Sequence, residues 1–219
     1  MKLLAVDTAL GACSCAVLED ARTIAHRFEV MERGHAERLA PMVAEVMAEA
    51  GLGFDALTRL AVTTGPGTFT GQRIGLSFMR GLRVALKIPL TGVTTLEAMA
   101  RAAMAQTGLF IGAALHDARR NEVYFELLKG ESTLIPPAIA TLEDAVAQLA
   151  SAAGNAPLCL AGTAGESAAA LYPGAILTQI RQPDAIWVAR IAQSKAVTEG
   201  APAPLYLRPP DAKLPAPRP

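Results

Sequence analysis

The chain opens twice in the same way, and this repetition limits its fold more than any other feature. Apolar runs at residues 2–6 and 13–18 flank a short turn, and residues 22–30 alternate like a third strand. From about residue 108 the pattern returns, with strand candidates at 109–115 and 122–128 split by the polar stretch 116–121. Helical periodicity follows both openings. We therefore expect a duplicated α/β unit: two lobes, each with a mixed β-sheet flanked by helices, and a cleft between them.

The expected lobes divide the chain at about residue 107. The N-terminal lobe, residues 1–106, is predicted to hold helices at 34–50, 69–86 and 95–105, with strands at 59–64 and 90–93. The C-terminal lobe, residues 107–200, is predicted to hold a helix at 142–152, a strand at 158–161, a helix that ends near residue 171, and a last helix at 183–198. The tail, residues 201–219, holds 7 of the 15 prolines, and its end is expected to be extended or disordered. Its apolar trio Leu205, Tyr206 and Leu207 is able to dock onto the body.

Composition narrows the class of protein. The chain is 52% hydrophobic and 18% charged, which is too apolar for intrinsic disorder. Lys plus Arg and Asp plus Glu number 20 each, which argues against a chain that grips nucleic acid alone. No apolar run reaches the roughly 18 residues of a membrane span, and Asp7 interrupts the apolar start. Three cysteines without framework spacing fit a reducing cytosol. We expect a soluble cytoplasmic protein.

Two aspartates hold matching places in the two lobes. Asp7 follows the first strand, where an actin-like or sugar-kinase-like ATPase places its first phosphate-loop aspartate, and Asp117 is its counterpart. Together they could hold Mg-ATP, or each could simply accept a hydrogen bond from a turn amide. The first turn lacks a lysine or a glycine pair to cradle phosphates. Gly162 and Gly165 form a second glycine turn, either a remnant of an adenosine-binding loop or a helix start.

A glycine-rich turn runs from Thr64 to Gly75 and is the most distinctive part of the chain. A P-loop would end in Gly-Lys-Ser/Thr, but here Gly71 is followed by Gln72 and Arg73. Phosphate binding is therefore disfavoured. Gly71 and Gly75 lie one helical turn apart, and this spacing favours close approach of another helix.

Two helices carry more apolar surface than one buried face needs. On the helix at 69–86, Ile74, Phe78 and Leu82 form one stripe, and the helix at 34–50 is similarly apolar. A fully wrapped core helix is one explanation, but we favour a second buried face against another subunit. The predicted partner interface comprises His35, Leu39, Met42, Val43, Val46, Gly71, Arg73, Ile74, Gly75, Phe78, Met79 and Leu82. Metal binding is not predicted, because the three histidines lack ligand spacing.

Four stretches resemble one known family. They are Leu4-Ala5-Val6-Asp7-Thr8-Ala9, His35-Ala36-Glu37-Arg38-Leu39-Ala40-Pro41-Met42, the turn at residues 65–75, and Asp117-Ala118-Arg119-Arg120-Asn121-Glu122-Val123-Tyr124. Leu205-Tyr206-Leu207-Arg208 also matches the family's C-terminal signature. On these motifs the chain resembles the TsaB (YeaZ) family, subunits for the synthesis of tRNA threonylcarbamoyladenosine.

The resemblance implies a two-lobed ASKHA fold, related to actin, Hsp70 and sugar kinases. It implies a non-catalytic subunit that binds a TsaD-like transferase through its two N-terminal helices, which also form a competing homodimer. A TsaE-like ATPase would join the complex, and tRNA would be contacted only indirectly. TsaD-like proteins carry a His-x-x-x-His metal motif, but here His35 is followed four residues later by Leu39. No cofactor is therefore expected in this chain, although a nucleotide at the junction of the assembled complex stays open. The alternative is an active ATPase or small-molecule kinase that uses Asp7 and Asp117.

Overall fold

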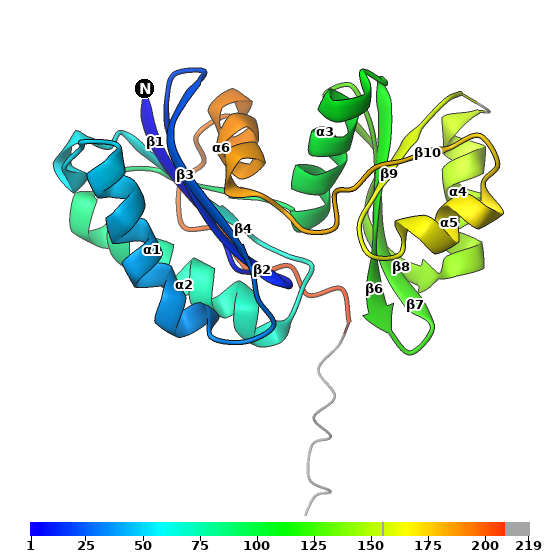
Figure 1. Ribbon diagram of the computed structural model, residues 1–219, viewed down its shortest axis with the longest axis horizontal. Helices are drawn as coiled ribbons and strands as arrows, with labels where there is room; N and C mark the ends of the chain where they lie inside the picture. Colours follow the sequence, from blue (N-terminus) through cyan, green and yellow to red (C-terminus); the bar gives the residue numbers. More distant parts are fainter. Residues whose placement is uncertain (155, 209–219) are drawn as a thin grey trace, which may run out of the picture.

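Two five-stranded sheets form the centres of two lobes (Figure 1). The structure is a computed structural model that describes residues 1–154 and 156–208. The first sheet contains β1 (Lys2–Asp7), β2 (Ala12–Glu19), β3 (Arg22–Val30), β4 (Arg59–Thr63) and β5 (Leu90–Val93). The second contains β6 (Ile111–Arg119), β7 (Glu122–Lys129), β8 (Ser132–Thr141), β9 (Cys159–Ala161) and β10 (Ile176–Leu177).

The two sheets have the same topology, so the predicted duplication is confirmed. The first sheet runs β3-β2-β1-β4-β5, and the second runs β8-β7-β6-β9-β10. In each sheet, the first three strands along the chain form an antiparallel meander. The first strand also pairs in parallel with the fourth, and the fourth pairs in parallel with the fifth. Because parallel neighbours need a crossover connection, a helix lies between the third and fourth strands and another between the fourth and fifth.

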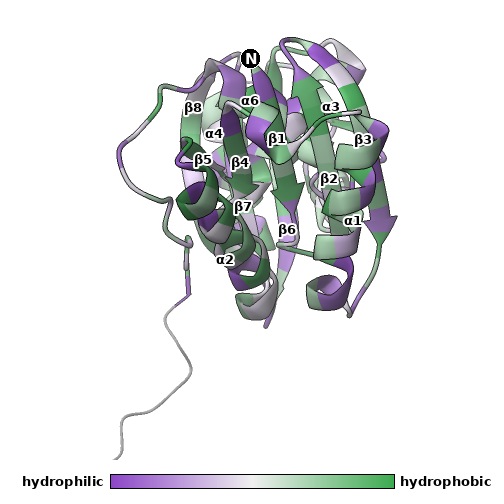
Figure 2. Ribbon diagram, turned by 90° about the vertical axis from the view of Figure 1, so that its left-hand side faces the viewer, coloured by the Kyte–Doolittle hydropathy of each residue, from purple (hydrophilic) through white to green (hydrophobic). Residues whose placement is uncertain are grey.

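Within residues 1–154 and 156–208, six α-helices cover the sheets. They are α1 (His35–Glu49), α2 (Phe69–Leu86), α3 (Thr95–Thr107), α4 (Leu142–Ala153), α5 (Gly165–Leu171) and α6 (Ala185–Ser194), and a short 3-10 helix, η1 (Phe54–Ala56), precedes β4. Figure 1 shows α1 and α2 on the outer face of the first sheet and α4 and α5 on the outer face of the second. In the side view of Figure 2, α1 and α2 face the viewer. None of the helices in the described part of the chain is long and apolar enough to cross a bilayer.

The remaining two helices lie between the sheets and are exchanged between the lobes. Helix α3 follows β5 in the chain but packs on β6, β7 and β9 of the second sheet. Helix α6 follows β10 but packs on β1 and β2, with Val188 buried against Leu3 and Leu18. A single cut at residue 107 therefore does not separate the lobes in space. Helix α6, from the predicted lobe of residues 107–200, belongs in space to the first sheet, and α3, from the predicted lobe of residues 1–106, belongs to the second.

Most element boundaries follow local sequence signals. Thr68, Thr94 and Thr141 cap α2, α3 and α4, each accepting a hydrogen bond from the backbone N–H three residues ahead. Asp184 caps α6 by accepting from the Ile186 N–H, so this helix begins after residue 184 and is shorter than predicted.

Three strands differ from the prediction: β6 is longer, and β8 and the short β10 were not predicted. Strand β6 continues through the polar residues His116 and Asp117 to Arg119, so the turn is shorter than the expected 116–121. Strand β8 was not predicted, because Pro136 and Pro137 are poor residues for a sheet interior. This strand lies at the edge of the second sheet, where one side of the backbone needs no partner, and prolines are tolerated there.

Candidate functional site

The first candidate region is the end of β1, where Asp7 is fully buried. Its Oδ1 accepts hydrogen bonds from the Thr63 hydroxyl at 2.6 Å and from the Ala9 N–H at 3.1 Å. Within residues 1–154 and 156–208, Oδ2 has no hydrogen-bond partner. Burial therefore raises the pKa of the Asp7 carboxyl from 3.8 to about 7, against the lowering effect of the Thr63 and Ala9 hydrogen bonds.

The turn that follows Asp7 contributes to an apolar cluster between the two lobes. Ala9 and Leu10, which follow β1, pack with Leu96 and Met99 of α3, and Ile180 adds to this cluster. The neighbouring backbone amide is also satisfied, since the Gly11 N–H donates to Oε1 of Gln182 at 2.9 Å. An incoming phosphate would have to displace this side chain to reach the turn. Sequence reasoning missed Gln182, because its partner lies far away along the chain.

The cleft itself has a volume of about 840 Å³ and is lined from both lobes. The first lobe contributes residues such as Gly67 and Thr68, and the second contributes His116, Asp117 and Arg119. Asp7 is not among the lining residues. The structure thus brings Asp117 but not Asp7 to the lining of the cleft, so the two carboxylates do not converge on one ligand there.

Asp117 repeats the local geometry of Asp7. Its Oδ1 accepts from the Arg119 N–H at 2.8 Å, two residues ahead, as Asp7 accepts from Ala9. Both carboxylates therefore accept a hydrogen bond from a turn amide, which was the alternative to holding Mg-ATP. Beside Asp117, His116 lies 3.2 Å from the Thr163 hydroxyl, and burial lowers its pKa to about 4. This imidazole stays neutral at physiological pH.

Gly162 and Gly165 serve packing at the turn into α5. Gly162 has a φ of +96°, and a Cβ there would lie 2.0 Å from the carbonyl oxygen of Leu115. A Cβ on Gly165 would meet the Leu177 side chain at 3.0 Å. Both glycines are buried. They are explained by close contact within the second lobe, which supports the helix start over an adenosine-binding loop.

The glycine-rich turn before α2 packs against the end of β1. The Thr8 hydroxyl donates to the Gly71 carbonyl at 2.7 Å and accepts from the Gly75 N–H at 3.0 Å. A Cβ on Gly71 would lie 2.3 Å from the Thr8 carbonyl oxygen. The packing interpretation of these glycines is therefore confirmed. Its predicted partner was wrong, because Thr8 of the turn after β1, and not another helix, fills the space.

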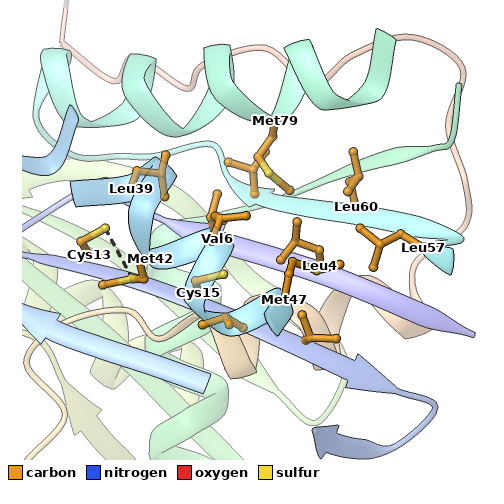
Figure 3. Close-up of a cluster of buried hydrophobic side chains, with 14 of the residues drawn as sticks. Leu4, Val6, Cys13, Cys15, Leu39, Met42, Met47, Leu57, Leu60 and Met79 are labelled. Atoms are coloured by element: carbon orange, nitrogen blue, oxygen red, sulfur yellow. Dashed lines mark hydrogen bonds between the residues drawn. The ribbon is translucent and has the colours of Figure 1, made fainter. Parts of the chain in front are cut away.

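The predicted partner interface needs a larger correction. Eight of its twelve residues are buried in the chain's own structure: His35, Leu39, Met42, Val43, Val46, Gly71, Gly75 and Met79. Figure 3 shows Leu39, Met42 and Met79 gathered with side chains from the strands of the first sheet, and the Met42 Sδ lies 3.8 Å from the Cys13 Sγ. Contact with a partner through these side chains would require the core to open. The apolar circumference of α1 faces the sheet.

Four of the predicted interface residues do reach the surface. Arg73 is exposed, while Ile74, Phe78 and Leu82 are partly buried beside the core cluster. The outward face of α1 carries small or acidic residues at Ala36, Glu37, Ala40, Pro41, Ala44, Glu45, Ala48 and Glu49, and that of α2 carries Phe69, Thr70, Arg73, Ser77, Gly81, Val84 and Ala85. A surface made by both helices is therefore present, with a different set of residues.

Two aromatic residues at one end of this surface were not predicted as site residues. The rings of Phe69 and Tyr206 stack with centroids 5.6 Å apart. The Arg73 guanidinium lies 3.5 Å from the Phe69 centroid, and its Nε donates to the Tyr206 hydroxyl at 2.9 Å. The tail thus docks as its apolar trio predicted, with the Leu205 N–H donating to the Thr64 carbonyl. The end of the tail, residues 209–219, lies outside the described residues.

Metal ligation finds no geometric support in the described ranges. No cluster of three His, Cys, Asp or Glu side chains there could hold an ion. His35 is buried at the start of α1, and Leu39, one turn further, is part of the core. Cys13, Cys15 and Cys159 are free and buried, and burial raises the pKa of the Cys13 thiol to about 12.

The sequence of this chain is similar to proteins of known name. Residues 27–173 match the model of the family described as TsaD, tRNA N6-adenosine threonylcarbamoyltransferase. The tRNA threonylcarbamoyladenosine biosynthesis protein TsaB of Escherichia coli is 41% identical over 57% of this chain and 54% of that protein. TsaB of Haemophilus influenzae is 40% identical over 57% of this chain and 52% of that protein. The chain thus aligns with little more than half the length of these two relatives.

Solved structures match a larger share of the chain. YeaZ from Pseudomonas aeruginosa superposes with a TM-score of 0.82 at 32% identity, over 94% of this chain and 99% of that one. The component A of (R)-2-hydroxyglutaryl-CoA dehydratase from Acidaminococcus fermentans superposes at 0.51 with 9% identity, over 86% and 96%, which concerns the fold alone. The duplicated sheets and the cleft between them define a two-lobed α/β protein with helices on the faces of both sheets. Within that class, the chain belongs to the TsaB (YeaZ) family.

Proposed function

We propose that this chain is a non-catalytic subunit of the machinery that makes tRNA threonylcarbamoyladenosine. It binds a TsaD-like transferase, and this binding is required for transfer of the threonylcarbamoyl group to the adenosine next to the anticodon in tRNAs reading ANN codons. The pathway rests on the relatives named TsaB. The non-catalytic role rests on one structural observation: Asp7, the carboxylate expected to serve a nucleotide, is 0% exposed and does not line the cleft between the lobes.

The outward surface of α1 and α2 is the proposed contact with the transferase. Its middle is made of small side chains such as Ala40, Ala44 and Gly81, so another helix can approach the backbone closely. Ile74, Phe78 and Leu82 are only partly buried and add apolar area beside them. The same surface would form a homodimer in the absence of the partner, so the two complexes would exclude each other.

A charge at the edge of this surface tests the contact. We expect Ile74→Glu to abolish a one-to-one complex with the TsaD-like subunit from the same source, measured by size-exclusion chromatography with light scattering. Val197→Glu is the matched control, because Val197 is 57% exposed and lies outside α1 and α2. The circular dichroism spectrum of each variant should match that of the wild type. A complex of normal affinity with Ile74→Glu would contradict the proposed interface.

The alternative is an ATPase or small-molecule kinase acting in the cleft. The cleft volume of about 840 Å³ is large enough for a nucleotide, which is what favours this alternative. Against it stand the burial of Asp7 and the Gln182 side chain on the Gly11 amide. Thermal unfolding with millimolar ATP and Mg²⁺ distinguishes the two, since a bound ligand must raise the Tm. We expect no shift. A shift that is lost in Asp117→Ala would favour the enzyme.

The remaining parts of the proposal concern partners and location. A TsaE-like ATPase would complete the complex, tRNA would be contacted only through the other subunits, and any nucleotide would sit at a junction between subunits rather than in this chain. The neutral balance of 20 basic and 20 acidic residues supports indirect contact with tRNA. Three free thiols support a reducing compartment such as the cytoplasm.

A further inference from the structure

The tail segment Pro202–Arg208 lies across both lobes. On the first lobe, the Pro202 carbonyl accepts from Arg80 of α2 at 2.5 Å, and the Leu205 N–H donates to the Thr64 carbonyl at 2.7 Å. On the second lobe, Arg208 donates to the Ala118 carbonyl at 3.1 Å and pairs with Glu122. Because this segment has no helix or strand of its own, these side-chain and backbone contacts hold it in place.

Between these anchors, the tail adds Tyr206 to the outer end of α2. We name the group Phe69, Arg73 and Tyr206 the aromatic patch. Phe69 is 56% exposed and Tyr206 is 43% exposed, although the two rings stack on each other. Arg73 is held against both rings by its hydrogen bond to the Tyr206 hydroxyl and its position over Phe69. The patch is therefore ordered before any partner arrives, which lowers the entropy lost on binding.

Charge along the segment that contains α2 is one-sided, although the whole chain is neutral. No Asp or Glu occurs between Asp55 and Glu97. Helix α2 and the residue that follows it carry four cations: Arg73, Arg80, Arg83 and Lys87. A partner that covers the patch should therefore present a carboxylate to Arg73, whose hydrogen bond to Tyr206 is made by Nε.

The way these cations are used favours a protein partner over a nucleic acid. A nucleic-acid backbone needs several free cations close together, but Arg80 is bonded to the Pro202 carbonyl, and Arg83 and Lys87 lie at the far end of α2 from Phe69. The two rings also stack on each other, so a base has no open slot between them. Tyr and Arg in a preformed cluster are typical of the anchors of protein interfaces.

We propose that the aromatic patch anchors the TsaD-like subunit, and that the tail segment Pro202–Arg208 is part of the partner surface. A segment of the partner that carries a carboxylate covers Phe69 and Tyr206, beside the surface of α1 and α2. This inference rests on the proposed function, since it names the part of the same contact that holds the partner most strongly.

The test measures the Kd of the complex by isothermal titration calorimetry. We expect Tyr206→Ala and Phe69→Ala each to weaken binding by about tenfold or more, because each removes a large anchor side chain. Tyr206→Phe keeps the ring but loses the acceptor of Arg73, so its loss should be smaller. Phe110→Ala is the matched control: Phe110 is an exposed aromatic, 65% accessible, on the second lobe, and its removal should leave the Kd unchanged.

The stacking of the two rings adds a second readout. In the double variant Phe69→Ala with Tyr206→Ala, the loss should be smaller than the product of the single losses, because each ring positions the other. Phe69, Tyr206 and Phe110 are each at least two-fifths exposed, so their alanine variants should still fold, which thermal unfolding checks.

The outcomes separate this inference from the function it rests on. If the wild type does not bind the TsaD-like subunit at all, both are wrong. If the wild type binds, Ile74→Glu abolishes binding, and the Tyr206 and Phe69 variants bind like the wild type, the interface stands and the aromatic patch is wrong as its anchor. If those variants instead lose affinity for bare tRNA while the Kd for the protein partner is unchanged, the choice of a protein partner is wrong.

Discussion

Replacing Asp7 by asparagine should remove most of a pH dependence that is built into the first sheet. The Asp7 carboxyl is 0% exposed, and its Oδ2 has no hydrogen-bond partner among the described residues. Its ionised form therefore loses the solvation it has in the unfolded chain, while the hydrogen bonds from Thr63 and Ala9 at Oδ1 compensate for part of this loss. In the Asp7→Asn variant, the side-chain amide oxygen can keep both of those hydrogen bonds without carrying a charge.

The size and sign follow from the pKa of the Asp7 carboxyl, which burial raises from 3.8 to about 7. A group whose folded pKa is raised stabilises the fold fully below its unfolded pKa, and this stabilisation is lost as pH rises to the folded pKa. About three pKa units correspond to about 4 kcal/mol of the free energy of unfolding. Of this, about 2.5 kcal/mol is lost between pH 5 and pH 8. Above pH 8 the contribution of Asp7 no longer changes.

The assay is urea unfolding of the wild type and Asp7→Asn at several pH values from 5 to 8.5. The single tryptophan, Trp187, is in α6 and packs against the first sheet, so its fluorescence reports unfolding of the lobe that contains Asp7. Glu126 is also buried, and burial raises its pKa to about 7, so the wild type has a second source of pH dependence. The difference between the two proteins isolates Asp7, because both keep Glu126.

We expect this difference to change by about 2.5 kcal/mol between pH 5 and pH 8, in favour of the asparagine variant at the higher pH. The unpaired amide group of the variant costs about 1–3 kcal/mol and shifts the whole curve by a constant, without changing its slope. Asp55→Asn is the control, because Asp55 is exposed before β4 and its removal should give a flat difference. A flat difference for Asp7→Asn as well would refute the account of a carboxyl cut off from solvent.

Two further predictions test how the core and the turns are packed. Val46→Glu should unfold the chain or lower the free energy of unfolding by more than about 4 kcal/mol, because Val46 is 0% exposed and the buried charge would be unpaired. The control is Val84→Glu in the same urea assay. Val84 is 72% exposed, so this change should alter the free energy of unfolding by less than about 0.5 kcal/mol. Gly162→Ala should cost more than Gly174→Ala: both have positive φ, but a Cβ at 162 meets the Leu115 carbonyl oxygen at 2.0 Å and one at 174 meets nothing within 4 Å. Equal costs for the two alanine variants, measured by thermal unfolding, would show that backbone strain alone sets the effect.

The architecture could be predicted because its signals are local and occur twice. Each lobe begins with two apolar runs around a polar turn, and threonine caps mark three of the helices. The exchange of α3 and α6 between the lobes could not be predicted, because both helices have a buried face and sequence periodicity does not say which sheet receives it. Strand β8 was missed because Pro136 and Pro137 are a local signal against a strand. The strand forms nevertheless, because its position at the edge of the sheet tolerates prolines.

The candidate site was predicted less well, because it depends on contacts between distant residues. Asp7 and Asp117 were correctly paired as equivalents, and each accepts from the amide two residues ahead. The burial of Asp7 could not be predicted, since it depends on residues that are distant in the sequence, such as Thr63, whose hydroxyl donates to the Asp7 carboxylate. The same holds for Gln182, which reaches the Gly11 amide across the cleft.

The error over the partner interface has a physical reason that also supports the aromatic patch. Counting large apolar residues on α1 identified the face toward the sheet, since Leu39, Met42 and Val46 are what a close-packed core needs. The outward face is made of alanine and glutamate, which bury little apolar area per residue when a partner covers them. Such a surface permits close approach but contributes little affinity by itself. Large, ordered side chains at its end have to supply the rest, and Phe69 and Tyr206 are the exposed aromatics placed there.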